Sequence, residues 1–427
     1  MAARLGRVTI DAMELIVSDQ ANQVPSLPAE PRFIGLREAA HALQPKTVAL
    51  RRRLHKHPEQ GLLLPHSQAA VLHALEGLDL EITTGKALSS VTAVLTGGRP
   101  GPAVLLRGDM DALPLLEETG LAFSSEIEGS MHACGHDTHV AMLASAARLL
   151  HDRRDVLAGK VIFMFQPGEE GHHGARHMIH EGVLDAAGEP PVRALALHIT
   201  STAPTGAICT RAGAVMSAAD SFTVTVTGRG GHCAMPHGAL DPIPAAAAMV
   251  GALHTMLGRR INAFEPAVLT VARITAGTTT NIIPEAAEIE GTIRSLSEPT
   301  RRTLHEELVR ICENVGAAYG CRVGVDLRPG YPATVNDDDV AERVLELAGS
   351  VLGDGRALHL EHPVMTSEDF SYILQRVPGA LAFLGACPPG VEPADAAPNH
   401  SNRVHFDESA LAHGVATYAA FALDTLR

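Results

Sequence analysis

The chain has 427 residues, of which 46% are hydrophobic and 19% charged, and its formal net charge at pH 7 is -14. This composition is typical of a globular protein with a large buried core, and the length favours two or three domains. The acidic balance argues against a nucleic-acid partner, because phosphate binding needs a basic face.

Residues 1–35 are interpreted as an N-terminal extension that precedes the folded part of the chain. Their start lacks the long apolar core of a secretory signal. Apolar runs elsewhere, such as residues 245–253, are too short to cross a bilayer. The 6 cysteines contain no C-x-x-C pair, and no disulfide framework is expected in a chain of this size. We therefore expect a cytoplasmic protein without a membrane partner.

From Leu36 the pattern becomes helical, and Pro58 ends this first helix. Continuous apolar runs then alternate with helical stretches, of which residues 140–150 are the clearest. Such runs are typical of strands buried in a mostly parallel sheet. They cover residues 103–106, 161–165, 194–197 and 380–384. The alternation predicts an α/β fold in which helices flank the sheet.

The middle of the chain follows a different pattern that predicts an inserted domain. The expected elements are strand 221–227, helix 243–256, strands 267–274 and 287–293, helix 301–318 and strand 322–327. This βαββαβ order is that of a ferredoxin-like α+β unit. We therefore expect a first domain in two parts, residues 36–212 and 329–427, with residues 213–328 inserted between them.

Polar side chains follow three of the predicted parallel strands. Asp109 and Asp111 follow the first strand, Glu169 and Glu170 follow the second, and His198 follows the third. Ligands of open α/β sheets bind at the carboxyl ends of the strands. The sequence therefore predicts a site at this edge of the sheet.

The segment M-H-A-C-G-H-D-T-H lies between the first two of these strands. It offers thiolate, imidazole and carboxylate groups, which are zinc-type ligands. Cys134 and His136 can converge on one ion from a loop, since Gly135 between them permits a tight turn. The alternative interpretation is a buried cysteine beside a helix N-terminus. The other candidates in this segment are His132, Asp137 and His139.

The paired carboxylates Glu169 and Glu170 suggest a division of labour. One can bind a metal ion, and the other can take a proton from a metal-activated water. A solvated acidic loop is the alternative for this pair taken alone. The chain contains no H-E-x-x-H, G-x-S-x-G or Walker sequence that would favour another chemistry.

Several motifs together resemble the hippurate hydrolase and auxin-conjugate hydrolase branch of the aminoacylase/carboxypeptidase family. The resemblance covers the chain from Leu36 to the C-terminus, with the motifs in the family's order. They are R-R-R-L-H-K-H-P-E, R-G-D-M-D-A-L-P, M-H-A-C-G-H-D-T-H, Q-P-G-E-E, G-R-G-G-H, T-T-N-I-I-P and S-E-D-F. The resemblance implies a zinc-peptidase-like catalytic domain with an inserted lid, or dimerisation, domain.

The resemblance also implies a site with two divalent ions of zinc, manganese or cobalt. Cys134 would bridge the ions, and Glu169 would be the general base and acid. The remaining metal ligands implied are His136, Glu170, His198 and His400. His405 is the rival of His400 for the last position.

Three further residues resemble the lid residues that hold the substrate carboxylate and the reacting carbonyl. They are His232, Asn281 and Arg294. Asp111 would orient a metal ligand from behind. Relatives form homodimers through this lid, so we expect a homodimer in which His232 of one chain reaches the active site of the other.

The function expected from this resemblance is hydrolysis of an N-acyl amino acid by metal-activated water. The alternatives within the same fold are a dipeptidase or carboxypeptidase and a deacetylase of N-acetyl amino acids. A protein that binds metal without turnover is a further alternative, which the intact Glu169–Glu170 pair argues against. In a last alternative, Cys134 is a nucleophile with a histidine base.

Overall fold

The computed structural model describes residues 31–427, which divide into two compact units. The large unit comprises the described residues up to Val215 together with Val335–Val364 and Asp369–Arg427. The small unit comprises Met216–Thr334 and Met365–Glu368. Each unit has its own hydrophobic core, as expected of separate domains.

The predicted N-terminal extension lies mostly outside the described residues. Within residues 31–35, Pro31–Phe33 forms a single turn of 3-10 helix, and Phe33 is buried in the core of the large unit. Residues 31–33, which the sequence pattern assigns to the extension, therefore form a helical turn. None of the described helices is long and apolar enough to cross a membrane.

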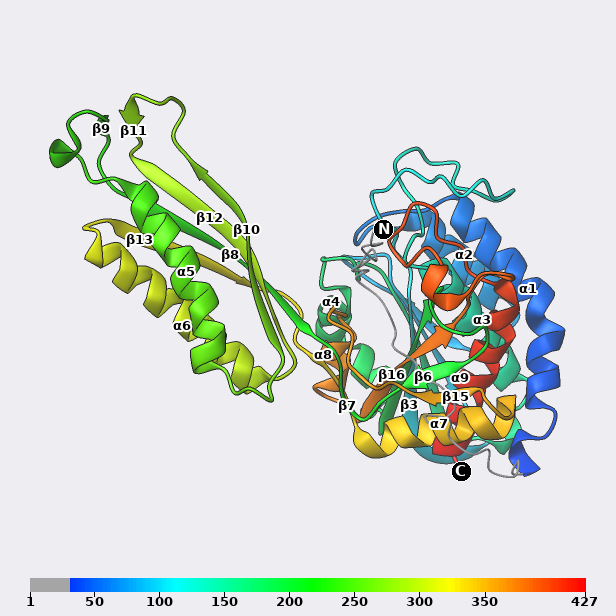
Figure 1. Ribbon diagram of the computed structural model, residues 1–427. Helices are drawn as coiled ribbons and strands as arrows, with labels where there is room; N and C mark the ends of the chain where they lie inside the picture. The colour runs from blue at the N-terminus through cyan, green and yellow to red at the C-terminus, as the bar shows by residue number, and fades with distance from the viewer. Residues whose placement is uncertain (1–30) are drawn as a thin grey trace, which may run out of the picture. The chain divides into compact units, whose positions relative to one another are not determined.

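The large unit is built on an eight-stranded mixed sheet with the order β1-β2-β4-β3-β5-β16-β6-β15 (Figure 1). The four central neighbours β4, β3, β5 and β16 run parallel to one another. They contain the four apolar runs that the sequence assigns to buried parallel strands. The strand bounds are β1 Glu81–Thr84, β2 Val91–Thr96, β3 Arg99–Asp109, β4 Ala158–Gln166, β5 Arg193–Thr200, β6 Ile208–Thr210, β15 Ala357–His359 and β16 Gly379–Gly385.

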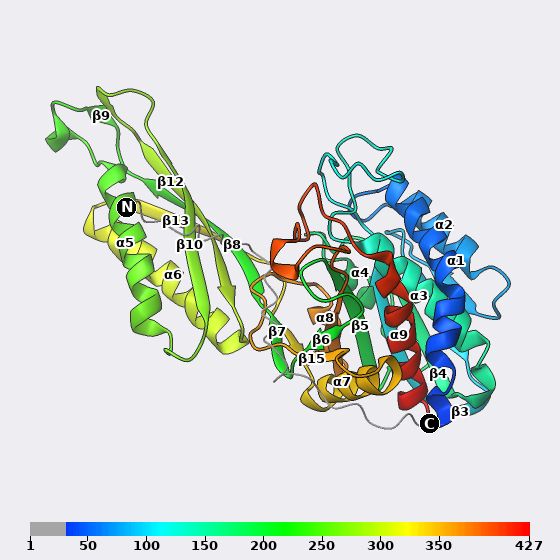
Figure 2. The ribbon, with the colours of Figure 1, turned by 45° about the vertical axis from the view of Figure 1, so that its right-hand side comes forward.

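Helices flank this sheet, as the alternating pattern predicts (Figures 1 and 2). Helices α3, α7 and α9 pack directly on strands, and α1 packs on α3 and α9. The bounds are α1 Leu36–Lys56, α2 Pro65–Leu75, α3 His136–His151, α4 Gly174–His180, α7 Asp338–Leu352, α8 Ser371–Leu374 and α9 Leu411–Thr425. The predicted α/β fold is thus confirmed.

The small unit has the predicted βαββαβ order. Its four-stranded antiparallel sheet has the strand order β10-β12-β8-β13, and both helices pack on it. The burial of β8 alternates strictly along the strand, because only one face is covered by the helices. The elements are β8 Ala218–Thr227, α5 Pro242–Arg260, β10 Ala267–Ala276, β12 Ala286–Ser295, α6 Glu298–Ala318 and β13 Arg322–Pro329.

Two short ladders complete the described structure. Gly231–His232 (β9) pairs with Ile282–Ile283 (β11) at one end of the small unit, as Figure 1 shows. The strands Gly213–Met216 (β7) and Thr334–Asn336 (β14) contain points at which the chain passes from one unit to the other.

Candidate active site

The predicted site lies at the carboxyl ends of adjacent parallel strands of the large unit. Strand β3 lies between β4 and β5, and Asp109 at the end of β3 pairs in register with Gln166 at the end of β4. His198 lies near the end of β5. Because the three strands are parallel neighbours, the segments that follow them meet at one edge of the sheet.

The first two candidate ligands lie on either side of the start of helix α3. Gly135 precedes this helix with φ +89°, in the left-handed region that favours glycine. A Cβ at this position would approach the side chain of Ile199 to 2.4 Å. The close approach explains the glycine and turns both Cys134 and His136 into the buried interior.

Two overlapping groups of ligand atoms share the thiol of Cys134. One group is formed with His136 and His198, the other with Glu170 and His400, and the atoms within each group lie within 4.8 Å of one another. The Sγ of Cys134 lies 3.4 Å from Nε2 of His198 and 3.2 Å from Nε2 of His400. The structure thus brings together the five residues proposed from sequence as metal ligands.

His400, rather than His405, takes part in this cluster. The Nε2 of His400 lies 3.4 Å from a carboxylate oxygen of Glu170. The Nε2 of His405 lies instead 3.2 Å from the carbonyl oxygen of Thr119. His400 has φ +68°, a rare backbone conformation for a residue with a side chain, and its amide donates to the carbonyl of Ala133. Such strained residues concentrate at functional sites.

Both buried histidines of the first group are oriented by a backbone carbonyl. Nδ1 of His136 donates to the carbonyl of Asp111 at 2.9 Å, and Nδ1 of His198 donates to that of Ile199 at 2.8 Å. Since a carbonyl can only accept, Nδ1 carries a proton in each ring, and Nε2 is the nitrogen that remains for a metal ion. Each Nε2 therefore faces the cluster as a potential ligand.

The electrostatics favour an anionic thiol here. Burial opposes the thiolate of Cys134, but His136 and His198 outweigh it and hold the pKa of this thiol well below its ordinary value. Burial likewise works against a charged His400, but contacts with Cys134 and Glu170 raise its pKa to about 10. Burial and the charge on Cys134 together raise the pKa of Glu170.

The donors present fit a divalent metal ion. Thiolate, imidazole and carboxylate are the ligands of zinc and its neighbours among the transition metals. The Nε2 of His136 and Oε1 of Glu170 are buried without a hydrogen bond, although leaving buried polar atoms unsatisfied costs free energy. Ligation would satisfy both atoms.

Asp111 fixes the loop that carries the two glutamates. Its Oδ1 accepts a hydrogen bond from the amide of Glu169, and its Oδ2 accepts one from the amide of Glu170, each at 2.9 Å. The side chain of Glu169 is buried next to the ligand groups. Its Oε1 accepts a hydrogen bond from the amide of Asp369 at 3.3 Å.

Sequence reasoning gave no role to several buried residues behind the site. The carboxylate of Asp369 accepts hydrogen bonds from Arg107 at 3.1 Å, Gln166 at 2.7 Å and the amide of Ala175 at 2.9 Å. Arg107 also binds Asp109 at 2.6 Å. Arg107, Asp109, Gln166 and Asp369 occur in the R-G-D, Q-P-G and S-E-D-F motifs, and these motifs are the feature of the sequence that could have pointed to them. What the motifs do not reveal is that one network joins them.

The remaining candidates of the M-H-A-C-G-H-D-T-H segment are engaged elsewhere or lie outside the shared cluster. Asp137 pairs with Arg51 at 2.8 Å, and Nδ1 of His139 lies 2.5 Å from Asp109. His132 is buried, but it belongs to none of the groups of possible ligands among the described residues. Only two of the five candidates in this segment therefore face Glu170.

The three proposed lid residues fall into two places within the small unit. His232 is exposed and pairs with Ile282, and the amide of Cys233 donates to the carbonyl of Asn281, so His232 and Asn281 are neighbours at the β9–β11 end. Arg294 is the penultimate residue of β12. This strand begins at Ala286, close to the β9–β11 end, and Arg294 lies eight positions further along it. At roughly 3.3 Å per residue this separation is about 26 Å. The structure therefore does not bring Arg294 to the other two within one chain.

Comparison with known proteins decides the family. Residues 105–424 match the model described as peptidase family M20/M25/M40. The chain belongs to this family. Two solved structures have a similar fold over most of the chain. An M20 peptidase from Bacillus subtilis, described as dinuclear and metal-binding, is 30% identical with a TM-score of 0.79, covering 90% of this chain and 99% of that one. A protein assigned as an aminohydrolase from methicillin-resistant Staphylococcus aureus is 32% identical with a TM-score of 0.85, covering 92% and 99%.

Curated relatives in this family carry different activities in their names. Thermostable carboxypeptidase 1 of Saccharolobus solfataricus is 37% identical over 380 residues, which are 88% of this chain and 94% of that protein. N-acetyl-L-cysteine deacetylase of Bacillus subtilis is 35% identical over 80% of this chain and 81% of its own length. IAA-amino acid hydrolase ILR1-like 2 of Arabidopsis thaliana is 34% identical over 89% and 85%.

The family resemblance inferred from the motifs is thus confirmed. The protein is a metal-dependent hydrolase of amide bonds, and its relatives act on small molecules or peptides.

Proposed function

We propose that this hydrolase cleaves the amide bond of N-acyl amino acids with two divalent ions held by the cluster around Cys134. The observation that carries the proposal is the pair of ligand groups that share Cys134 while Glu169 lies beside them. His136 and His198 would bind one ion, Glu170 and His400 the other. Zinc, manganese and cobalt suit this mixture of sulfur, nitrogen and oxygen donors.

Glu169 is the residue proposed to move the proton. When bound, divalent ions supply Lewis acidity toward the substrate carbonyl and lower the pKa of water. Glu169 receives the proton of the attacking water and passes it to the nitrogen of the leaving amine. Its buried position and the hydrogen bond from the Asp369 amide restrict its side chain to one place. Such preorganisation is what a proton carrier needs.

The geometry favours metal binding over a nucleophilic role for Cys134. Its Sγ lies between His198 and His400 and belongs to both groups of possible metal ligands. Both imidazoles instead present Nε2 toward the sulfur, with Nδ1 of His198 already committed to a carbonyl. A thiolate set among these imidazole and carboxylate groups would be suited to holding divalent metal ions.

We further propose a homodimer formed through the small unit. Strand β10 is an edge of the four-stranded sheet, and its side chains Val268 and Ile274 are exposed. Pairing with a second copy of the chain would cover this edge and these side chains. The separation of Arg294 from His232 supports the same proposal. In a dimer, Arg294 would bind the substrate carboxylate in its own chain's site, and His232 and Asn281 would serve the partner's site. The cytoplasmic location stays a prediction.

A dipeptidase, carboxypeptidase or N-acetyl amino acid deacetylase is the alternative, favoured by the names of the relatives. A substrate panel distinguishes these activities. Metal-free protein is reloaded with zinc, manganese or cobalt and assayed with acetyl, benzoyl and indoleacetyl amino acids and with unblocked dipeptides. We expect the highest kcat/KM on the blocked amino acids. A clear preference for unblocked dipeptides would replace our proposal with a dipeptidase or carboxypeptidase, and turnover confined to the acetyl substrates would replace it with a deacetylase.

Arg294 provides a second arm of this experiment. If its guanidinium binds the substrate carboxylate, Arg294→Ala weakens use of free-acid substrates by about 10- to 100-fold, as expected for a lost charge-assisted pair. The matching carboxamide substrates change little. Equal losses on both forms would contradict this role.

A further inference from the structure

A second pocket lies on the large unit, between helices α1, α2 and α3, and is not part of the site described above. Its volume is about 380 Å³, within the range of small-molecule sites. Ala144, the lining residue on α3 that is nearest in sequence to the ligand His136, lies eight positions along this helix. At 1.5 Å per residue, that is about 12 Å along the helix. The two sites therefore do not share lining residues.

The pocket exists because the lining side chains are small where the three helices face one another. Each helix contributes one stripe of side chains at helical spacing. The three helices lie side by side in Figures 1 and 2. The apolar part consists of Leu43, Ala49, Leu50, Ala70, Ala74 and Ala144. Larger residues at the alanine positions would fill the groove, as ridges fill grooves between most packed helices.

The lysine and arginine side chains are the charged part of the lining, and His73, whose Nδ1 lies 3.1 Å from the carboxylate of Glu76, also lines the pocket. Lys46, Arg53 and Arg148 line the pocket, and no Asp or Glu does. Among the described residues, neither Lys46 nor Arg53 forms an ion pair, and Arg148 donates to the backbone carbonyls of Ala74 and Glu76. In a chain with a net charge of -14, three unneutralised cations around one cavity are unexpected.

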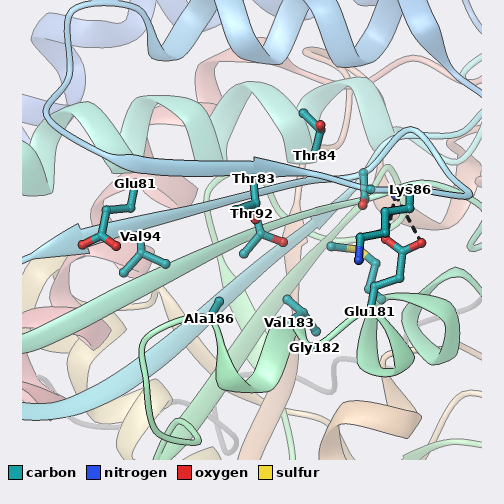
Figure 3. Close-up of a pocket in the computed structure, with 13 residues that line it drawn as sticks. Glu81, Thr83, Thr84, Lys86, Thr92, Val94, Glu181, Gly182, Val183 and Ala186 are labelled. Carbon is teal, nitrogen blue, oxygen red and sulfur yellow. Dashed lines mark hydrogen bonds between the residues drawn. The ribbon is translucent and has the colours of Figure 1, made fainter.

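A further pocket of this unit shows the contrast. It has a volume of about 290 Å³ and lies beside β1, β2 and the segment after α4 (Figure 3). There Glu81 and Glu181 accompany Lys86, and the Glu181 carboxylate accepts hydrogen bonds from the amides of Lys86 and Ala87. Carboxylates thus accompany the cation in this pocket, whereas no carboxylate lines the helical pocket.

We propose that the pocket between α1, α2 and α3 binds a small organic anion with an apolar body, of the class of medium-chain or aromatic carboxylates. The alanine and leucine side chains would contact the hydrocarbon. Lys46 and Arg53 on one side and Arg148 on the other would bind the carboxylate, since charge-assisted hydrogen bonds are the strong ones. Desolvation by the apolar floor strengthens such pairs compared with those on an open surface.

The test measures octanoate binding to the metal-loaded protein by isothermal titration calorimetry. We expect a binding event that survives blockade of the metal site with a competitive substrate analogue. The double variant Lys46→Gln/Arg53→Gln weakens this event on the order of tenfold or more. The control Arg259→Gln/Arg302→Gln removes the same charge from exposed positions of the small unit, and it should leave the affinity for octanoate unchanged. Equal affinity in the first double variant and in the unchanged protein would overturn the proposal.

A second variant tests the apolar part without altering charge. Ala74→Leu places a larger side chain in the groove and should abolish octanoate binding while the thermal unfolding temperature stays within a few degrees. Inorganic phosphate serves as the probe without an apolar body, and we expect it to bind far more weakly than octanoate. If phosphate binds as well as octanoate, or if Ala74→Leu binds octanoate normally, the pocket is not a site for amphipathic anions.

Discussion

The carboxylate of Asp111 holds Glu170 by its backbone, through a 2.9 Å hydrogen bond from the Glu170 amide to Oδ2. The other oxygen of Asp111 accepts the amide of Glu169 at the same distance, and its carbonyl accepts a hydrogen bond from His136. Asp111, two residues after the end of β3, therefore positions a ligand from α3 and both glutamates that follow β4. Because each carboxylate oxygen of Asp111 accepts a backbone N–H, its contribution depends on both oxygens being acceptors.

Asp111→Asn should lower kcat by about 10²-fold with a smaller change in KM. The amide nitrogen of Asn would face one of the two backbone N–H groups, so that two donors meet and the glutamate loop shifts. A misplacement of 1 Å is enough for a loss of this size. Steady-state kinetics with metal analysis test it. Retention of normal kcat in the fully metal-loaded variant would contradict the positioning role.

Glu169→Gln should retain the metal ions and lose most turnover. The substitution removes the proton carrier but touches none of the five proposed ligands, and general acid–base groups contribute roughly 10²–10⁴-fold. Metal content and kcat are measured on the same preparation. A fully loaded variant with near-normal activity would eliminate Glu169 as the proton carrier.

The Cys134 variants separate metal bridging from thiol chemistry. Cys134→Asp should keep metal and some activity because a carboxylate can bridge two cations, whereas Cys134→Ala should lose metal. Cys209→Ala is the control, since Cys209 is fully buried in β6 and burial raises its pKa to about 12. If both Cys134 variants are inactive with unchanged metal content, the thiol acts as a nucleophile instead.

The pH dependence of stability should reveal the buried ion pair of the small unit. Asp220 binds Arg301 at 2.6 Å and His305 at 2.7 Å. Burial opposes its ionisation, but hydrogen bonds from His305 and Arg301 outweigh it and lower the pKa of Asp220 to about 2. Since this is below the unfolded value of roughly 3.9, the stabilisation is present above about pH 4 and is lost as the pH falls through 2.

Asp220→Asn should therefore unfold at a lower temperature than the unchanged protein at pH 7, with the difference shrinking below pH 4. Thermal unfolding followed by circular dichroism measures this. Asp326→Asn is the matched control, because Asp326 forms only an exposed pair with Arg328 and such pairs contribute little. A difference that persists undiminished at the lowest pH at which the protein stays folded would argue against the ion pair as its source.

Subunit complementation tests whether His232 acts across a dimer. His232→Ala and Glu169→Gln should each be nearly inactive, and removal of an oxyanion donor costs roughly 10²–10³-fold. When the two variants exchange subunits, each mixed dimer contains one site with both residues intact, so activity should partly return. Proven exchange without any recovery would mean that His232 does not serve the partner's site.

The sequence by itself determined the class of fold and the motifs that carry the chemistry. Continuous apolar runs marked the parallel strands, and alternating burial marked β8, because periodicity reflects which face of an element is covered. The paired carboxylates followed a strand end, where ligands of α/β sheets bind. These inferences need only the local pattern and the parallel order of neighbouring strands.

Tertiary structure decided which side chains meet. The choice of His400 over His405 rests on a contact with Cys134 across 266 positions, and the Asp369–Arg107 contact spans 262. The separation of Arg294 from His232 follows from the length of β12 and from the β9–β11 ladder at its far end. Spacing along a chain does not encode such distances, because they depend on how each element packs against the others.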